Sequence, residues 1–114
     1  MREIDRKCAE ILGWKDIRFY RSQVLDADEM IGESPDGTKD RIVPFFSSNI
    51  MSSIKYLVSK FKESDYTIMI TCNHSIWKVT VIANNGWHSA SDENLSAAIS
   101  LVFIKTYGDS SCSL

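Results

Sequence analysis

The chain has 114 residues, a formal net charge of −2 at pH 7 and a hydrophobic fraction of 44%. This length predicts one domain with a core of its own, and the charge excludes the global basic field that draws proteins onto nucleic acid. No stretch approaches 18 consecutive apolar residues, so no membrane-spanning helix is expected. The three cysteines are widely spaced and show no C-x-x-C pair, which indicates free thiols in a reducing compartment such as the cytoplasm.

The first part of the chain predicts a helix followed by a strand. Between residues 2 and 12, apolar side chains recur at helical spacing and form one stripe: Ile4, Cys8, Ile11 and Leu12. Gly13 stands where a left-handed C-terminal cap is expected. Residues 17–22 then alternate in side-chain character and predict a strand with Arg18 and Tyr20 on one face.

An acidic segment follows over residues 25–41. Pro35 and Gly37 interrupt it, so we expect a loop or a loosely held hairpin with a short strand around Met30. Its carboxylates supply four candidate binding residues: Asp26, Asp28, Glu29 and Glu33. Clustered carboxylates suit a hard cation, but the segment lacks the glycine and the ligand spacing of an EF-hand loop. The preferred interpretation is therefore a solvated acidic loop, and no metal site is predicted.

The strongest helical signal comes next. Pro44 restricts the preceding apolar run to extended or edge structure, and Ser47 or Ser48 is expected to cap the helix. The apolar stripe of this helix comprises Ile50, Ile54, Leu57, Val58 and Phe61. Its lysines lie largely off the stripe, which indicates an ordinary solvated face.

Three strands are predicted in the second half. Alternation over residues 66–72 and 77–83 indicates two strands of a hairpin that reverses at Asn73 and His74. A second turn, with two asparagines and a glycine, leads into a short strand over residues 87–90.

Ser91 is then expected to cap a final helix that is apolar nearly all round. Such a helix is either covered on two sides or pressed against a second subunit. Candidate contacts of a homodimer are therefore Ala97, Leu101 and Ile104. The serine-rich segment over residues 108–114 is expected to be a flexible tail.

Together these elements predict an α+β domain over residues 1–107. We expect three helices and a mainly antiparallel sheet of four to five strands, layered as an α/β/α sandwich. The order of parts resembles the phage ABA sandwich domain, a family of small proteins from bacteriophages and prophages. The resemblance is carried by Gly13-Trp14, Pro44-Phe45-Phe46-Ser47-Ser48-Asn49-Ile50, Trp77-Lys78-Val79 and Leu95-Ser96-Ala97-Ala98-Ile99. It implies a layered sandwich and a mobile-element origin, hence the cytoplasm of a host cell, and it carries over no active-site residue.

Catalytic chemistry finds little support in the sequence. His74 and His88 are each followed by serine, whereas two-histidine phosphoesterases place the hydroxyl two residues on, on the same strand face. Cys72 precedes Asn73 and His74, but strand neighbours point to opposite sides. Nucleophile, base and orienting group therefore do not assemble into a recognisable set, and the chain lacks a phosphate-binding glycine loop. No enzymatic activity and no cofactor are predicted.

We therefore expect a non-enzymatic phage or prophage accessory protein that acts by binding, with inhibition of a host defence protein as its role. Trp87 and His88 join the four acidic residues as candidate contacts, because interfaces favour tryptophan at their centres. Trp87 has the alternative role of covering one end of the core. Direct binding to nucleic acid or membrane is not expected.

A nucleotide-like small ligand is the alternative partner. It requires cationic side chains near aromatic walls, and the candidates are Arg18, Arg21, Arg41 and Lys55. A phosphoesterase using His74 and His88 is the third hypothesis, and it requires both imidazoles to face one cleft.

Overall fold

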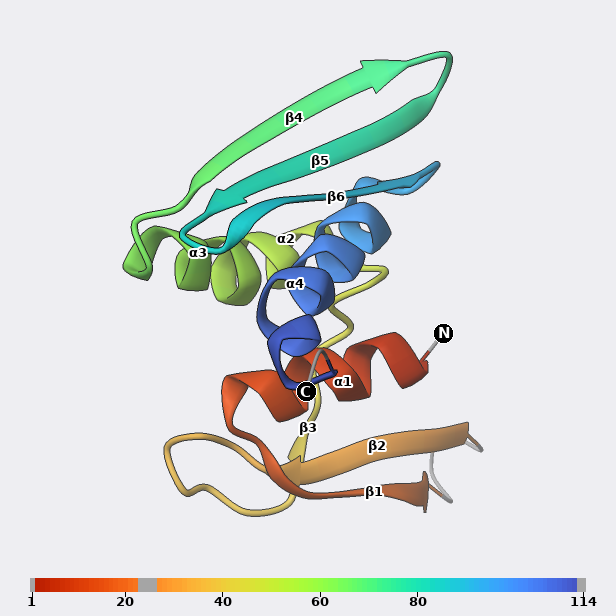
Figure 1. Cartoon of the computed structure of the whole chain (residues 1–114). Coiled ribbons are helices and arrows are strands. Elements are labelled where there is room, and N and C mark those ends of the chain that lie inside the picture. Colours follow the sequence, from red (N-terminus) through yellow and green to blue (C-terminus); the bar gives the residue numbers. More distant parts are fainter. Residues whose placement is uncertain (1, 23–26, 113–114) are drawn as a thin grey trace.

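The computed structural model describes the backbone of residues 2–22 and 27–112 and the side chains of residues 2–20 and 29–108. In chain order the elements are α1 (Arg2–Leu12), β1 (Lys15–Ser22), β2 (Ala27–Glu33), β3 (Arg41–Ile42), a continuous helical segment made of α2 (Ile50–Ser52), η1 (Ser53–Val58) and α3 (Ser59–Glu63), then β4 (Thr67–Asn73), β5 (Ile76–Ala83), β6 (Gly86–Asp92) and α4 (Leu95–Cys112) (Figure 1).

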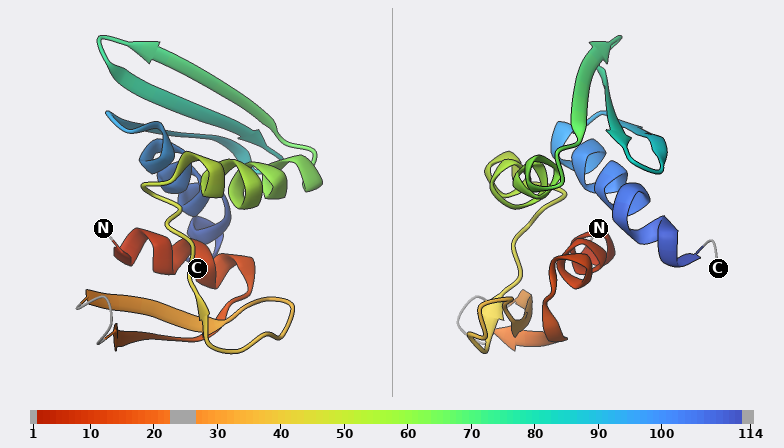
Figure 2. Two further views of the ribbon diagram at one scale, coloured as in Figure 1. Left: turned by 180° about the vertical axis from the view of Figure 1, so that it is seen from behind. Right: turned by 60° about the vertical axis from the view of Figure 1, so that its left-hand side comes forward.

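The helices lie between two separate sheets (Figures 1 and 2). One antiparallel sheet has the order β1-β2-β3, and the other has the order β4-β5-β6. The predicted α+β class, the three helices and the antiparallel pairing are confirmed. The prediction of a single sheet of four to five strands with helices outside it, as an α/β/α sandwich, is wrong.

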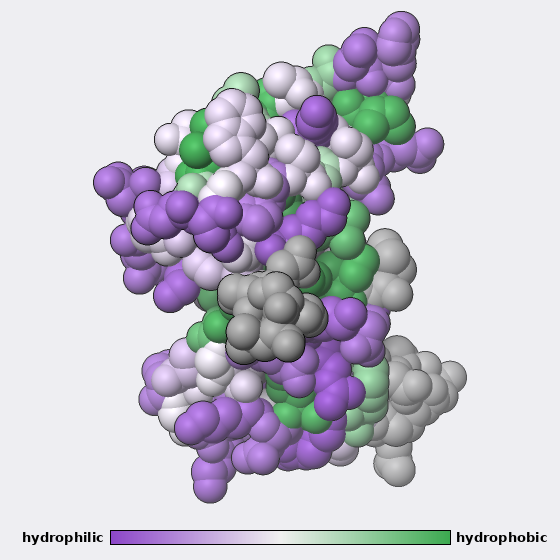
Figure 3. All heavy atoms as spheres, in the orientation of Figure 1, coloured by the Kyte–Doolittle hydropathy of each residue, from purple (hydrophilic) through white to green (hydrophobic). Residues whose placement is uncertain are grey.

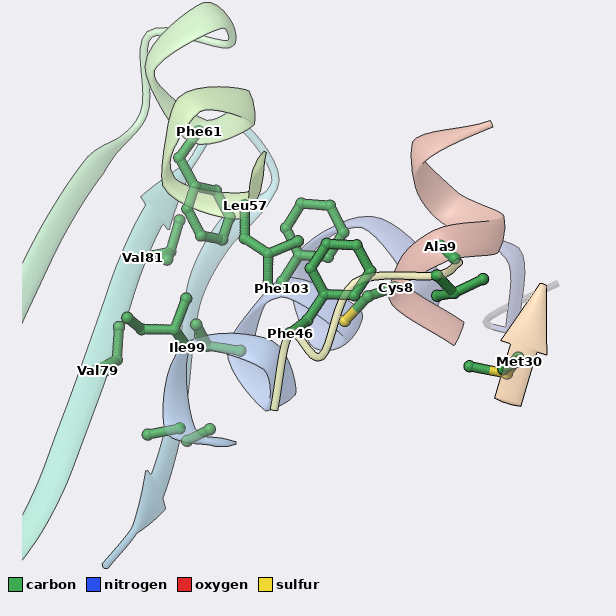
Figure 4. Close-up of a cluster of buried hydrophobic side chains, with 14 residues drawn as sticks. Cys8, Ala9, Met30, Phe46, Leu57, Phe61, Val79, Val81, Ile99 and Phe103 are labelled. Carbon is green, nitrogen blue, oxygen red and sulfur yellow. The ribbon is translucent and has the colours of Figure 1, made fainter. Parts of the chain in front are cut away.

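The two-sheet arrangement follows from strand pairing and from the apolar helices. Among the described residues, each strand pairs only with its neighbour in sequence, and the helical segment separates the two sets of strands. The inner faces of both sheets then need an apolar layer between them. Met30 enters the shared core from the first sheet, and Val79 and Val81 enter it from the second (Figure 4).

Helix α1 matches its prediction, including its cap. Gly13 has a φ of 102°, the Trp14 N–H donates to the carbonyl of Ala9 (3.0 Å), and the Gly13 N–H donates to the carbonyl of Glu10 (3.1 Å). These two bonds form a Schellman motif, in which a glycine satisfies the last carbonyls of the helix at no steric cost.

The acidic segment contains a longer strand than predicted. The hairpin is confirmed, but β2 spans seven residues, and its Met30 is buried. At Gly32 a Cβ atom would lie 2.9 Å from the carbonyl oxygen of Lys15, so the close approach of β1 requires glycine there.

The second helix begins later than predicted and turns differently. Its N-cap is Asn49, whose side-chain oxygen accepts bonds from the N–H groups of Met51 (3.0 Å) and Ser52 (3.2 Å). The predicted caps, Ser47 and Ser48, are wrong, because the chain is still in a turn at these residues.

The middle of this helix, η1, is a π-helix. Leu57 and Phe61 of the predicted stripe are buried, whereas Ile50 and Ile54 are exposed and Ser53 is buried instead. A π-helical turn holds an extra residue, so a stripe spaced for a regular α-helix does not stay on one face.

The second sheet confirms the predicted meander with shifted turns. His74 and Ser75 form the first turn, at φ values of 53° and 65°. Strand β6 extends to Asp92, so the predicted cap Ser91 lies within the strand. The side-chain oxygen of Asn94 caps α4 instead, accepting from the N–H groups of Ser96 (2.8 Å) and Ala97 (3.4 Å).

Helix α4 is covered on two sides within the chain. It packs against β5 and β6 on one side and against α1 and η1 elsewhere. Ala97 is buried, and Leu101 and Ile104 are half-buried against the core. The apolar residues predicted as a surplus dimer face are thus largely used by the chain itself. The helical backbone continues to Cys112, into the segment predicted as a tail from Gly108.

On the face shown in Figure 3, hydrophobic atoms reach the surface between the two sheets, while hydrophilic side chains gather over the outer parts. Within the described part of the chain, none of the helices has the length and apolar character needed to cross a bilayer.

Candidate functional site

An open hollow of about 500 Å³ lies on the first sheet, and we name it the first hollow. Its lining residues are Arg18, Phe19, Tyr20, Glu29, Ile31, Asp40 and Ile42. Strand register explains most of the grouping: Phe19 pairs with the buried Met30 and so belongs to the opposite face, but Arg18 pairs with Ile31, which pairs in turn with Ile42. Paired residues share a face of a sheet, so this row crosses all three strands.

Large apolar side chains stand in solvent around this hollow. Phe19, Tyr20 and Ile42 are 59%, 56% and 55% exposed. Single exposed apolar residues are common on protein surfaces, but gathered ones mark interaction sites. The first hollow is therefore the strongest candidate for a binding site among the described residues.

A charged pair borders the first hollow. Arg18 forms an ion pair with Asp40 and donates a second bond to the carbonyl of Asp16 (3.1 Å). A β-bulge between Lys15 and Arg18 re-aims the strand here. Asp16 and Asp40 both have left-handed backbone, at φ values of 53° and 55°.

This pair contributes little to stability, because both side chains are more than half exposed and solvent screens their attraction. Strained backbone that holds an exposed guanidinium in place is typical of a binding site. We interpret Arg18 as positioned toward the hollow by the bulge and by its two aspartate partners.

The four acidic residues that were predicted to form one site lie in different parts of the chain. Glu29 lines the first hollow opposite Tyr20, and Glu33 is half-buried at the end of β2, paired with Lys15. Asp28 is in β2, with its side chain outside the described part, and Asp26 lies outside the described residues altogether. The predicted acidic segment thus contributes two carboxylates to the hollow, Glu29 and Asp40; of the predicted candidates whose side chains the structure describes, Glu29 lines it and Glu33 does not.

Sequence reasoning missed Phe19, Tyr20 and Ile42 as site residues. Alternation did place Arg18 and Tyr20 together on one face of β1, but nothing in the sequence showed that this face stays uncovered. Its exposure follows from the position of the helices, which lie on the other side of the first sheet (Figure 2).

Trp87 and His88 lie on the second sheet, far from the first hollow (Figure 1). Trp87 is 70% exposed, so it does not cover an end of the core. His88 is half-buried, and its Nε2 is 3.1 Å from the side-chain oxygen of Asn85. The two residues cannot join Glu29 in one site, and a contact role for Trp87 stays a prediction.

The two histidines are also separated from each other. His74 occupies the turn before β5, whereas His88 pairs with Val81 near the other end of β5. The five residue steps from Ile76 to Val81 span about 17 Å of strand. The chain therefore does not bring the two imidazoles to one cleft, which is the arrangement that the phosphoesterase hypothesis requires. In the described part of the chain, His, Cys, Asp and Glu side chains do not gather in any group of three that could hold a metal ion.

A second hollow of about 290 Å³ lies between the end of α1, the β2–β3 connection and η1. Its lining residues are Leu12, Trp14, Ser34, Pro35, Asp36, Arg41 and Tyr56. Hydrogen bonds from the Ser34 hydroxyl and the Thr38 N–H hold the pKa of Asp36 down at about 2, so this carboxylate is charged.

No family model, curated protein or solved structure matches this chain. The resemblance to the phage ABA sandwich family therefore stays an expectation from sequence.

Proposed function

We propose that the protein acts by binding another protein through the first hollow. The observation that carries the proposal is the pair of large apolar side chains Tyr20 and Ile42, each more than half exposed on one face of the first sheet, around a hollow with Arg18 at its border. Protein interfaces are enriched in tyrosine, phenylalanine and arginine at their centres and are polar at their rims.

The charges of this hollow favour a particular kind of partner. Glu29 and Asp40 bring two negative charges and Arg18 brings one positive charge, so the surface is acidic on balance. The whole chain also carries a net charge of −2. A protein surface with an apolar anchor flanked by basic residues is complementary, whereas a nucleic acid backbone is not.

The biological setting is proposed on separate grounds. A mobile-element origin and a host target, such as a defence protein, are supported only by the resemblance to the phage ABA sandwich family. The physical proposal does not depend on them, since it concerns the surface and the chemistry of its partner.

A small anionic ligand in the second hollow is the second candidate function. Arg41 shares this hollow with the aromatic side chains of Trp14 and Tyr56, and the ammonium group of Lys55 lies 5.3 Å from the Tyr56 ring centroid. This grouping meets the requirement for cationic groups beside aromatic walls. The charged Asp36 in the same hollow opposes an anion, which places this candidate second.

Capture of partners by a tagged protein tests the first proposal. We expect a discrete partner from a lysate of the organism that encodes the chain, and we expect the double variant Tyr20→Ser/Ile42→Ser to lose it. The control is Met51→Ser, which removes an apolar side chain that is 72% exposed on α2 and should leave capture unchanged. Retention of the partner by the double variant, with melting temperatures equal, would contradict the proposal.

A thermal-shift assay with nucleotides distinguishes the second candidate function from the first. Nucleotides that bind the folded chain raise its melting temperature by mass action. A rise that disappears in Arg41→Ala but persists in Tyr20→Ser/Ile42→Ser would assign ligand binding to the second hollow.

A further inference from the structure

The two sheets end in four edge strands within the described part of the chain, and three of these edges are protected. An unprotected edge offers unpaired N–H and C=O groups to any other strand, so proteins block edges with charges, bulges, short strands or covering groups. Strand β1 has a bulge and the charged residues Lys15, Asp16, Arg18 and Arg21. Strand β3 has only two residues.

A side chain of α4 covers the edge of β6. The ammonium group of Lys105 donates to the backbone carbonyl of Ser89 at 2.7 Å, so a side chain occupies an acceptor of this edge. Helix α4 also packs closely along β6. An incoming strand would have to displace Lys105.

Strand β4 lacks all of these protections. Its sequence, Thr67-Ile68-Met69-Ile70-Thr71-Cys72-Asn73, contains no charged residue and no proline. All of its residues except Ile68 are exposed, and Met69 and Ile70 are each 46% exposed. A seven-residue uncharged edge of high β-propensity pairs with another strand unless something blocks it.

The turn after β4 identifies the backbone groups that point outward. His74 and Ser75 both have positive φ, as the central residues of a type I′ turn do, so Asn73 and Ile76 form a hydrogen-bonded pair. Such pairs alternate along an antiparallel ladder. The backbone N–H and C=O groups of Thr71 and Met69 are therefore bonded to β5. The backbone groups that point away from β5 belong to Ile68, Ile70 and Cys72.

We propose that β4 pairs antiparallel with β4 of a second copy of this chain, joining the two sheets into one six-stranded sheet across a two-fold axis. A two-fold axis at Ile70 places Ile70 opposite Ile70 of the second copy and Ile68 opposite Cys72 of the second copy. Every outward-facing residue then meets an outward-facing residue, and all seven positions pair.

The second copy is the occupant that this edge fits. An uncharged strand has no charge pattern with which to select a foreign strand, whereas it meets its own copy without repulsion and with matched length. This surface differs from the α4 residues expected from sequence and from the first hollow, so it does not rest on the proposed function.

Light scattering after size-exclusion chromatography tests the proposal. The wild type is expected at twice the 12.9 kDa of one chain, and Ile70→Lys at the mass of one chain, because a lysine would face its own copy. Met51→Lys, on the exposed part of α2, is the matched control and should keep the dimer. A wild type that stays monomeric across a concentration series, or an Ile70→Lys dimer, would overturn the proposal.

Cross-linking tests the register even if Ile70→Lys fails to fold. In a Cys72→Ser/Cys112→Ser background, Ile70→Cys is expected to form a disulfide-linked dimer with a mild oxidant, because paired Cα atoms lie about 5.5 Å apart. Thr67→Cys is the control, since two copies of residue 67 would be separated by about 20 Å along the strands. Equal cross-linking of both variants, or no cross-linking of Ile70→Cys, counts against this register and this edge.

Discussion

Asp5 connects α1 to the segment that leaves the first sheet. Its buried carboxylate accepts a bond from the Arg2 guanidinium (2.6 Å) and from the backbone N–H of Ser47 (2.7 Å), and Arg2 also donates to the carbonyl of Val43 (2.9 Å). Removing this carboxylate leaves a buried N–H without its acceptor and a guanidinium without its charge partner.

We therefore expect Asp5→Ala to lower the free energy of unfolding by about 3 kcal/mol. Asp5→Asn keeps an oxygen for the Ser47 N–H and should cost less. Glu10→Ala is the control, because its 3.9 Å pair with Arg6 is exposed and contributes about 0.5 kcal/mol or less. Urea unfolding measures all three, and equal losses for Asp5→Ala and Glu10→Ala would refute a structural role for the buried carboxylate.

At the scale of elements, Gly32 and Gly108 have opposite expected effects on substitution by alanine. Gly32→Ala brings a Cβ to 2.9 Å from a backbone carbonyl that cannot move freely, so we expect a loss of about 1–3 kcal/mol. At Gly108 in α4 a Cβ would meet side-chain atoms at ordinary distances of 3.5 Å, and helix propensity predicts a gain of about 0.5–1 kcal/mol. Thermal unfolding distinguishes the two, and a neutral Gly32→Ala would show that β1 and β2 can separate without cost.

Sequence patterns predicted those elements well whose structure is determined by residues close by in the chain. The Gly13 cap and the β4–β5 hairpin depend on neighbouring residues, and both were predicted. The starts of the other two helices were misplaced, because Asn49 and Asn94 compete with nearby serines and only the folded path of the chain decides among them. Ile50 and Ile54 were wrongly predicted to be buried, because hydrophobic periodicity does not detect the π-helical turn that changes the face on which they lie.

At the scale of the whole molecule, the number of sheets and the candidate site were beyond reach of sequence. Local alternation identifies strands, but it does not say whether two sets of strands join into one sheet or face each other across helices. The first hollow depends on that choice, since Tyr20 and Ile42 are exposed only because the helices lie on the other face of their sheet (Figure 2). Arg18 and Glu29 were named from charge alone, and their apolar neighbours were not.

The helical layer that joins the two sheets contains a buried thiol at the contact of α1 and α4, which links pH to the stability of the whole chain. Cys8 donates to the carbonyl of Ser100 at 3.7 Å. Burial, and then the charge of Asp5, raise the pKa of its thiol from 9.0 to about 12, against the lowering effect of that hydrogen bond.

Below pH 9 the thiol is neutral in both the folded and the unfolded chain, and its full contribution to stability is present. Between pH 9 and about 12 the unfolded chain releases a proton that the folded chain keeps, so the free energy of unfolding falls by about 1.4 kcal/mol per pH unit from this group. We expect Cys8→Ala to be less stable at pH 7 but to lose stability less steeply above pH 9. Cys72→Ala is the control, because Cys72 is exposed and its removal should leave the slope unchanged. Urea unfolding at pH 8, 9, 10 and 11 measures the slopes, and parallel curves for the wild type and Cys8→Ala would show that the thiol ionises as freely in the folded chain as in the unfolded one.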